Sequence, residues 1–229
     1  MVIPAIDLAP LWLTFRLAGV TTALLFVPGV ALAWWLARWR SPLRPLVEAI
    51  VALPLVLPPV VLGFYLLLLL NPQGWITRTM HALGYQGTLA FTFGGLVAGS
   101  MVYSLPFMVQ PLLRAFEAIP RDILDAAATL RAGAWDRFIH VVMPLSRGGI
   151  VVAVTLAFAH TVGEFGVVLM LGGDIPGRTR VASIDIYDHV EAMEYPQAHM
   201  LAATMVVIAL IVLALVYGLH RRIGMTGDD

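Results

Sequence analysis

Long stretches of the chain carry no charge and are almost entirely apolar, and this feature limits the possible folds more than any other. A helix needs about 20 apolar residues to cross roughly 30 Å of hydrocarbon. Five stretches meet this length, and each predicts one membrane-spanning helix. They are Leu17–Ala37 (extended outward by Leu11–Phe15), Ala49–Leu70, Thr88–Leu113, Gly148–Gly173 (broken only by Glu164) and Ala198–Leu219. The sequence therefore predicts an all-α, polytopic membrane helical bundle with about five transmembrane helices, with six as the alternative.

The composition excludes several classes of protein. Hydrophobic residues make up 60% of the 229 residues, more than a single soluble core of this size can hide. All 14 basic residues are arginine, and a Walker A loop needs a lysine, so the chain is not a conventional P-loop ATPase. The absence of cysteine excludes disulfides and thiolate catalysis. The scattered histidines form no zinc pattern, and we expect no metal, no cofactor and, at zero net charge, no nucleic-acid partner.

The arginines are distributed unevenly between the predicted loops. With an odd number of spans, ten arginines fall on one face: Arg38, Arg40, Arg44, Arg114, Arg121, Arg131, Arg137, Arg147, Arg221 and Arg222. Three fall on the other face: Arg78, Arg178 and Arg180. Because cytoplasmic loops are enriched in basic residues, we predict an outside N-terminus and a cytoplasmic C-terminus. The first span is too long for a signal-peptide core, so we expect it to be retained.

Prolines and one acidic residue interrupt the predicted spans. The stretch Leu53–Gly63 holds Pro54, Pro58 and Pro59, and each proline removes a backbone donor and bends or breaks its helix. Two interpretations are open: a kink that improves packing, or a bent helix that lines a pathway. The candidate pathway or gate residues are Pro58, Pro59, Thr161, Glu164 and Phe165.

Glu164 is ionisable and lies within a predicted span, which by default suggests a function. His160 precedes it by four residues, so a continuous helix would place both on one face. A bond from Glu164 to His160 or to the backbone, a role in a gate or dimer seam, and a proton relay are all compatible with this spacing. No arginine cluster lies at mid-membrane, and a dianion in hydrocarbon is costly without compensating charge. We therefore expect a weak, transient anion pathway.

The segment Arg114–Arg147 is too charged to span a membrane. Pro120 suits the start of a helix of about 11 residues, and Gly133 suits its end. Apolar residues recur along one face of this helix. They are Ile123, Leu124, Ala127 and Leu130. The face predicts either an interfacial helix on lipid head groups or a helix that docks into a groove of a cytoplasmic partner.

The sequence DAAATLRAGAWDRFIHVVMPL (Asp125–Leu145) resembles the EAA motif of ABC-transporter permeases. Asp125 stands for the glutamate of the motif, Ala126 and Ala127 for its alanines, and Pro144 for the proline of its Leu-Pro. Arg131 occupies the usual glycine position, and Gly133 could supply the turn instead. The resemblance implies an ATPase-coupling loop over 114–147, within one permease domain over 1–229. Its coupling residues are Asp125, Ala126, Ala127, Leu130, Arg131, Gly133 and Pro144.

A finer resemblance covers most of the chain. The segments LPLVLPPVVLGFYLLLL (Leu53–Leu69) and TLAFAHTVGEFGVVLMLGGDIPGRTR (Thr155–Arg180) are similar to those of molybdate permeases. This similarity implies a homodimer in the cell inner membrane, with cytoplasmic ATP-binding subunits and a periplasmic or surface oxyanion-binding protein as partners. Tungstate and sulfate are alternative substrates. A proton-coupled secondary carrier is the competing function, whereas an intramembrane enzyme lacks a convincing nucleophile–base pair.

Overall fold

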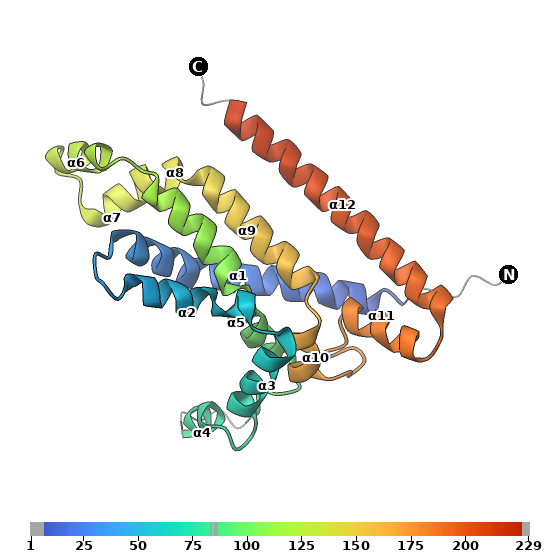
Figure 1. Ribbon diagram of the computed structural model, residues 1–229. Coiled ribbons are helices and arrows are strands. Elements are labelled where there is room, and N and C mark those ends of the chain that lie inside the picture. The colour runs from blue at the N-terminus through green and yellow to red at the C-terminus, as the bar shows by residue number, and fades with distance from the viewer. Residues whose placement is uncertain (1–6, 83, 85–86, 226–229) are drawn as a thin grey trace.

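The computed structural model describes residues 7–82, 84 and 87–225, and these residues form helices joined by turns, with no strand among them (Figure 1). In chain order the helices are α1 (Ala9–Arg38), α2 (Arg44–Val56), α3 (Pro59–Leu70), α4 (Trp75–Ala82), α5 (Phe93–Glu117), α6 (Arg121–Thr129), α7 (Ala134–Arg137), the π-helix η1 (Phe138–Val142), α8 (Met143–Leu145), α9 (Arg147–Val162), α10 (Gly166–Gly172), α11 (Ala182–Glu191) and α12 (Tyr195–Met225).

Several helices are long and apolar enough to cross a membrane. In the described part of the chain there are four such stretches: Ala9–Arg38, Pro59–Ala82, Phe93–Glu117 and Tyr195–Ala214. The bent pair Ala134–Leu145 and Arg147–Val162, which meet at 75°, would make a fifth. The predicted all-α bundle with about five spans is therefore confirmed in class and number.

The prolines have different effects in different helices. α1 continues through Pro28, and α5 continues through Pro106 and Pro111. The predicted span Ala49–Leu70, by contrast, is divided, because α2 ends at Val56 and α3 begins at Pro59. The ring of Pro59 disfavours the helical conformation of the preceding residue, and Pro58 adopts ψ 133°. This stretch is thus a broken helix rather than a straight one.

The predicted span Gly148–Gly173 is also divided, so a single continuous helix is wrong here. α9 ends at Val162 and α10 begins at Gly166. A Cβ atom on Gly166 would lie 2.8 Å from Pro59 Cβ. The lack of a side chain at Gly166 therefore lets the break after α9 approach the break before α3 closely.

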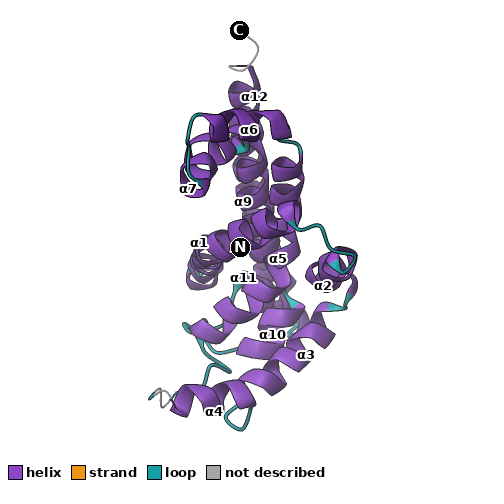
Figure 2. Ribbon diagram, turned by 90° about the vertical axis from the view of Figure 1, so that its left-hand side faces the viewer, coloured by secondary structure: helices purple, strands orange, loops and turns teal. Residues whose placement is uncertain are grey.

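The core lies between α1, α5 and α9, and α3 and α10 continue it toward α4 (Figure 2). Two clusters of buried apolar side chains fill it. One includes Leu36, Met108, Leu112 and Val142, and the other includes Leu17, Leu96, Val167 and Leu171. α6 and α7 lie at one end of the molecule and α4 lies at the other (Figures 1 and 2).

The last helix, α12, packs mainly on α11 and α9, and most of its described surface is exposed (Figure 1). Its exposed apolar residues are Val206, Val207, Leu210, Ile211 and Leu213. Such a surface suits lipid tails. The side chains of Arg221 and Arg222, which contribute to the predicted topology, lie outside the described part of the structure.

Candidate functional site

A cleft of about 500 Å³ opens where the two helix breaks meet. Of the predicted pathway residues, Pro59, Glu164 and Phe165 line it, and His160 and Tyr103 complete its polar and aromatic wall. Pro58 is exposed as the N-cap of α3, and Thr161 is buried against α5; neither lines the cleft. Helix periodicity does not identify Tyr103, because its link to α9 is a tertiary contact.

Glu164 is the acidic residue that lines this cleft. Only 3% of the surface of Glu164 is exposed, and neither of its carboxyl oxygens makes a well-formed hydrogen bond with a described residue, although Ser100 lies close enough to interact with it. Its backbone is held instead, because Ser183 Oγ donates to the Glu164 carbonyl oxygen at 2.7 Å. A buried carboxylate without a partner is costly. Its placement therefore favours a role beyond packing.

His160 does not pair with Glu164. Its Nδ1 forms a hydrogen bond with Ser104 Oγ at 2.9 Å, and Ser104 also contacts Thr161 Oγ1 at 2.9 Å. The ring of His160 stacks on Phe107 with centroids 3.9 Å apart. The interpretation that Glu164 bonds directly to His160 is therefore wrong. The two residues also do not share a face of one helix, because α9 ends before Glu164. The two side chains meet only as walls of the cleft.

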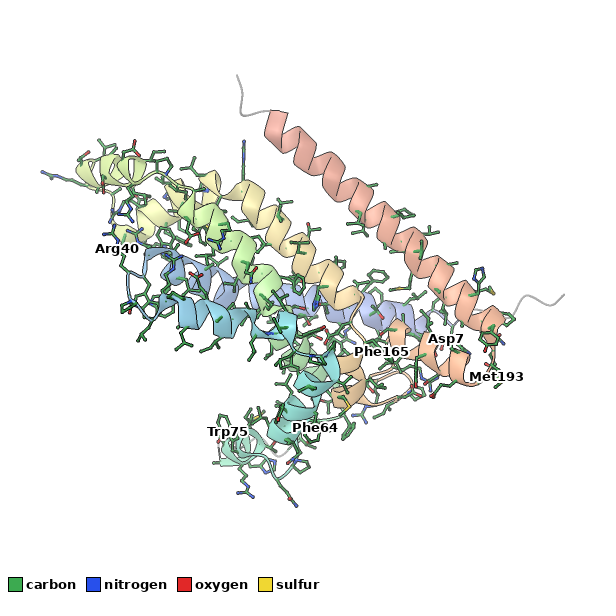
Figure 3. All side chains as sticks on the ribbon, in the orientation of Figure 1. Asp7, Arg40, Phe64, Trp75, Phe165 and Met193 are labelled. Atoms are coloured by element: carbon green, nitrogen blue, oxygen red, sulfur yellow. The ribbon has the colours of Figure 1, made fainter. Side chains whose placement is uncertain are left out.

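Phe165 connects the helix break to α11. Its ring lies 5.2 Å from that of Tyr187, and the Tyr187 hydroxyl donates to Glu191 at 2.6 Å. Figure 3 shows Phe165 between α9 and α11. Phe165 and the Ser183 hydrogen bond thus link α11 directly to residues of the cleft.

The segment of the EAA resemblance forms α6, α7, η1 and α8. α6 spans nine residues and buries none of them, and it begins after Pro120, which is its N-cap rather than its first residue. Leu124 packs partly against the core, whereas Leu130 is 83% exposed and Trp135 is 74% exposed. Asp125, Ala126 and Ala127 lie within α6, and Pro144 lies in α8. The segment therefore presents large apolar side chains that no described residue covers.

The end of α6 differs from the prediction. Arg131, not Gly133, adopts the left-handed conformation, with φ +63°, while Gly133 has φ −64° and caps the start of α7. Ala132 N donates to Ala127 O at 3.2 Å, and Arg131 N donates to Ala128 O at 3.0 Å. This is the Schellman arrangement, in which glycine usually occupies the position of Arg131. Arg131 thus has the left-handed conformation that glycine adopts most readily.

Replacing Arg131 by glycine is expected to stabilise this turn. A left-handed conformation costs an L-residue roughly 1–2 kcal/mol, and the greater freedom of glycine in the unfolded chain offsets about half of the gain. We expect slower amide hydrogen exchange over 129–132 in the variant. Gly133→Ala is the control, because φ is ordinary there and a Cβ atom would meet no neighbour within 4 Å. Faster exchange in Arg131→Gly than in the native chain would contradict the assignment.

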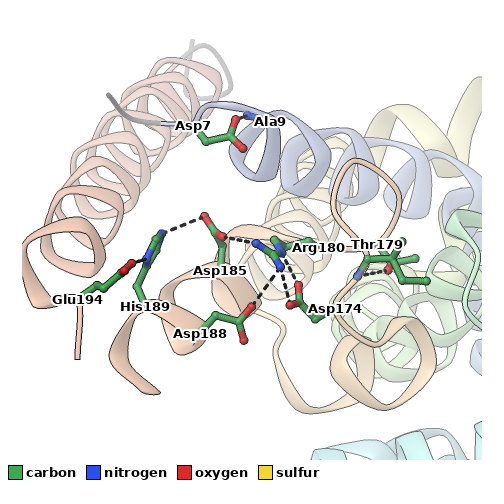
Figure 4. Close-up of polar contacts among 10 residues, drawn as sticks. Asp7, Ala9, Asp174, Thr179, Arg180, Asp185, Asp188, His189 and Glu194 are labelled. Atoms are coloured by element: carbon green, nitrogen blue, oxygen red, sulfur yellow. Dashed lines mark hydrogen bonds and ion pairs between the residues drawn. The ribbon is translucent and has the colours of Figure 1, made fainter. Parts of the chain in front are cut away.

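Acidic residues surround one arginine on the loop after α10 and on α11, away from α6 and α7 (Figure 1 and Figure 4). The Arg180 guanidinium pairs with Asp174, approaches Asp185 at 3.5 Å and approaches Asp188 at 3.7 Å. Burial, with a hydrogen bond to Asp174, raises the pKa of Asp188 to about 6. Burial alone would raise the pKa of Asp174, but hydrogen bonds from Arg180 and Asp188 hold it below its usual value. Asp185 and Asp188 lie on α11, whereas Asp174 and Arg180 lie in the loop between α10 and α11.

This cluster predicts a pH dependence. The pKa of Asp188 in the folded state exceeds its ordinary value of 3.8. Between about pH 4 and 6 Asp188 therefore keeps a proton in the folded state that the unfolded chain has lost, and the free energy of unfolding falls as the pH rises through that window. We expect the amides of residues 174–191 to be better protected from hydrogen exchange, relative to the rest of the chain, at pH 5 than at pH 7.5. Asp188→Asn should reduce this difference between the two pH values. Glu191→Gln, outside the Arg180 cluster, serves as control. An unchanged difference in Asp188→Asn would refute the assignment.

Comparison with known proteins places this geometry in context. Residues 29–225 match the family described as binding-protein-dependent transport system inner membrane component. The chain is 58% identical over 215 residues to the molybdenum transport system permease protein ModB of Azotobacter vinelandii, covering 94% of this chain and 95% of that protein. It is 31% identical to the sulfate transport system permease protein CysT of Escherichia coli (strain K12), over 86% of this chain and 70% of CysT.

The fold is also similar to that of solved structures. A chain of a bacterial ABC transporter involved in the import of the acidic polysaccharide alginate superposes with a TM-score of 0.77 at 19% identity. The match covers 94% of this chain and 79% of that one. At this identity the likeness establishes the fold alone.

Proposed function

This chain belongs to the family of binding-protein-dependent transport system inner membrane components, and from that membership we propose that it is the membrane-spanning permease subunit of an ABC importer for molybdate. It is a multi-pass inner-membrane permease rather than an enzyme, and a separate subunit hydrolyses the ATP. The complete transporter contains two copies of this chain, two cytoplasmic ATP-binding subunits and a periplasmic or surface oxyanion-binding protein.

Molybdate is proposed as the substrate because the chain is 58% identical to a molybdenum permease over almost the whole of both chains. The sulfate permease is a more distant relative, at 31% identity. Tungstate remains the alternative, because it forms a tetrahedral dianion of nearly the same size.

The exposed segment from α6 to α7 supports the proposed coupling to an ATPase. α6 has no buried residue, and Leu130 and Trp135 expose most of their surfaces. Short amphipathic helices bind partners by laying such side chains into a groove. We assign this role to Asp125, Ala126, Ala127, Leu130, Arg131, Gly133 and Pro144 as one docking surface.

The cleft between the two helix breaks supports a pathway that holds its solute only briefly. Its lining includes no arginine, and Glu164 is its acidic member. A carboxyl group cannot compensate the charge of a dianion in either protonation state, and the lining contains no basic side chain other than His160. In this proposal Pro58, Pro59, Thr161, Glu164 and Phe165 form or support the gate, while affinity and selectivity belong to the oxyanion-binding protein.

Reconstitution with the proposed ATP-binding and oxyanion-binding partners tests the proposal. We expect ATP hydrolysis in proteoliposomes to rise when the loaded binding protein is added with molybdate, less so with sulfate, and not when the ATPase is omitted. A proton-coupled carrier would instead accumulate the oxyanion on a pH gradient alone and lose this activity in Glu164→Gln. Uphill transport by the chain without its ATPase would overturn the proposal.

A further inference from the structure

A second cavity, of about 420 Å³, lies at the arginine-rich end of the molecule. It is formed by the end of α1, the α1–α2 loop, the end of α5, α6 and α7. Figure 3 shows Arg40 on the α1–α2 loop at this end. The volume falls within the roughly 300–1,000 Å³ typical of small-molecule sites. The cavity is separate from the cleft at Glu164 and shares no lining residue with it.

The charge of this cavity is strongly positive. Its charged lining residues are Arg38, Arg40, Arg44, Arg121, Arg137, Glu117 and Asp125. Glu117 is already paired with Arg44 and Arg114, and Arg44 also binds Glu48. The ion pairs of the described residues do not involve the other four lining arginines. Four arginines thus face a single acid, Asp125, that is not paired.

Arg137 supplies a separate indication that this cavity binds an acceptor group. Its Nε atom is buried and has no hydrogen-bond partner among the described residues. A buried donor left without an acceptor costs free energy that a bound acceptor would recover. The planar guanidinium group matches the oxygens of a phosphate better than a single backbone carbonyl does.

The surroundings of the cavity indicate its depth relative to the membrane. Trp34 and Arg38 also line an adjoining cleft with Trp35 and Trp39. Trp35 and Trp39 stack with centroids 4.5 Å apart, and the Arg38 guanidinium lies 4.5 Å from the Trp34 ring. Tryptophans gather at the level of lipid head groups. The exposed side chains of Leu43 and Leu46 beside Arg44 add an apolar surface suited to an acyl chain.

We propose that this arginine-lined cavity binds a phosphate-class oxyanion, and that its occupant is the headgroup of an anionic phospholipid. The arginines contact the phosphate oxygens, the tryptophans lie beside the glycerol region, and α2 contacts the acyl chains. Because α6 and α7 form one wall, a bound lipid would also brace the segment that exposes Leu130 and Trp135. The site does not depend on which solute the chain transports.

Native mass spectrometry of the full chain, released from micelles that mix phosphatidylglycerol with phosphatidylcholine, tests this proposal. We expect the native chain to retain phosphatidylglycerol selectively. The double variant Arg40→Gln with Arg137→Gln should retain it roughly 10- to 30-fold more weakly, since basic residues near a membrane surface each contribute to anionic-lipid binding. The double variant with lysine at both positions keeps the charge and should still prefer phosphatidylglycerol, which distinguishes loss of binding from loss of folding.

The matched control removes two charges elsewhere. Arg78 and Arg147 are exposed and lie outside the cavity, so Arg78→Gln with Arg147→Gln should retain the lipid as the native chain does. A parallel sample with inorganic phosphate separates the two sources: displacement of the lipid at millimolar phosphate would support the oxyanion site but assign it to a soluble anion. Equal retention in all variants, or equal loss in both glutamine pairs, would overturn the proposal.

Discussion

Replacing Leu130 by glutamate is expected to abolish stable assembly with the ATP-hydrolysing subunit while leaving the chain itself folded. Leu130 is 83% exposed at the end of α6, so the variant removes little packing within the chain. Burying a leucine against a partner contributes about 1.5–3 kcal/mol, and forcing a carboxylate into the same groove costs several kcal/mol more. Together these changes predict a loss of affinity of at least roughly 1,000-fold.

Co-purification and stimulated ATP hydrolysis measure this effect. Leu130→Met keeps the apolar contact and should assemble normally. Leu8→Glu places the same charge on an exposed leucine at the start of α1, away from α6. This variant should also assemble. If Leu130→Glu bound the ATPase and stimulated it as the native chain does, α6 would be an interfacial helix on lipid rather than a docking helix.

The class of fold could be predicted from the sequence because one physical requirement determines it. Backbone donors and acceptors in hydrocarbon must be satisfied within the segment, so a long uncharged apolar run becomes a helix whatever its partners are. The runs around Leu17–Ala37 and Thr88–Leu113 correspond to α1 and α5 for this reason. The amphipathic face of α6 was predictable in the same way, since its spacing is local.

The helix break beside Glu164 could not be predicted, because residues far away in sequence hold it open. Gly166 packs against Pro59, and Ser183 binds the Glu164 carbonyl. Gly163 and Gly166 were the available signals, but glycines also occur inside membrane helices. The partners of His160 were hidden for the same reason, since Ser104 lies 56 residues earlier.

The turn at Arg131 shows a different limit. Glycine is the residue that most readily adopts positive φ, so local preference points to Gly133. The backbone bonds that close α6 require the left-handed residue directly after Leu130, and Arg131 occupies that position. The hydrogen bonds that close α6 therefore outweigh the conformational preference of the side chain.

Enlarging Gly149 is expected to separate α5 from α9 and to destabilise the bundle strongly. A Cβ atom on Gly149 would overlap Ala115 Cβ and lie 3.4 Å from the Pro111 carbonyl oxygen. Neither neighbour is the flexible end of a side chain, so relief requires movement of a backbone. Overpacking of this kind costs typically 1–3 kcal/mol, and we expect Gly149→Val to lie at the upper end and Gly149→Ala at the lower end. Thermal unfolding of the purified chain in detergent measures both.

A compensating substitution separates this steric cause from a general intolerance of mutation. Ala115→Gly removes the atom that Gly149→Ala would strike, so the double variant should recover most of the lost stability, as directly contacting residues depart from additivity. Gly19→Ala is the matched control, because a Cβ atom there meets nothing within 4 Å and alanine favours a helix over glycine by about 1 kcal/mol. If the double variant were as unstable as the sum of its single changes, close contact at Gly149 would not be what holds α5 and α9 together.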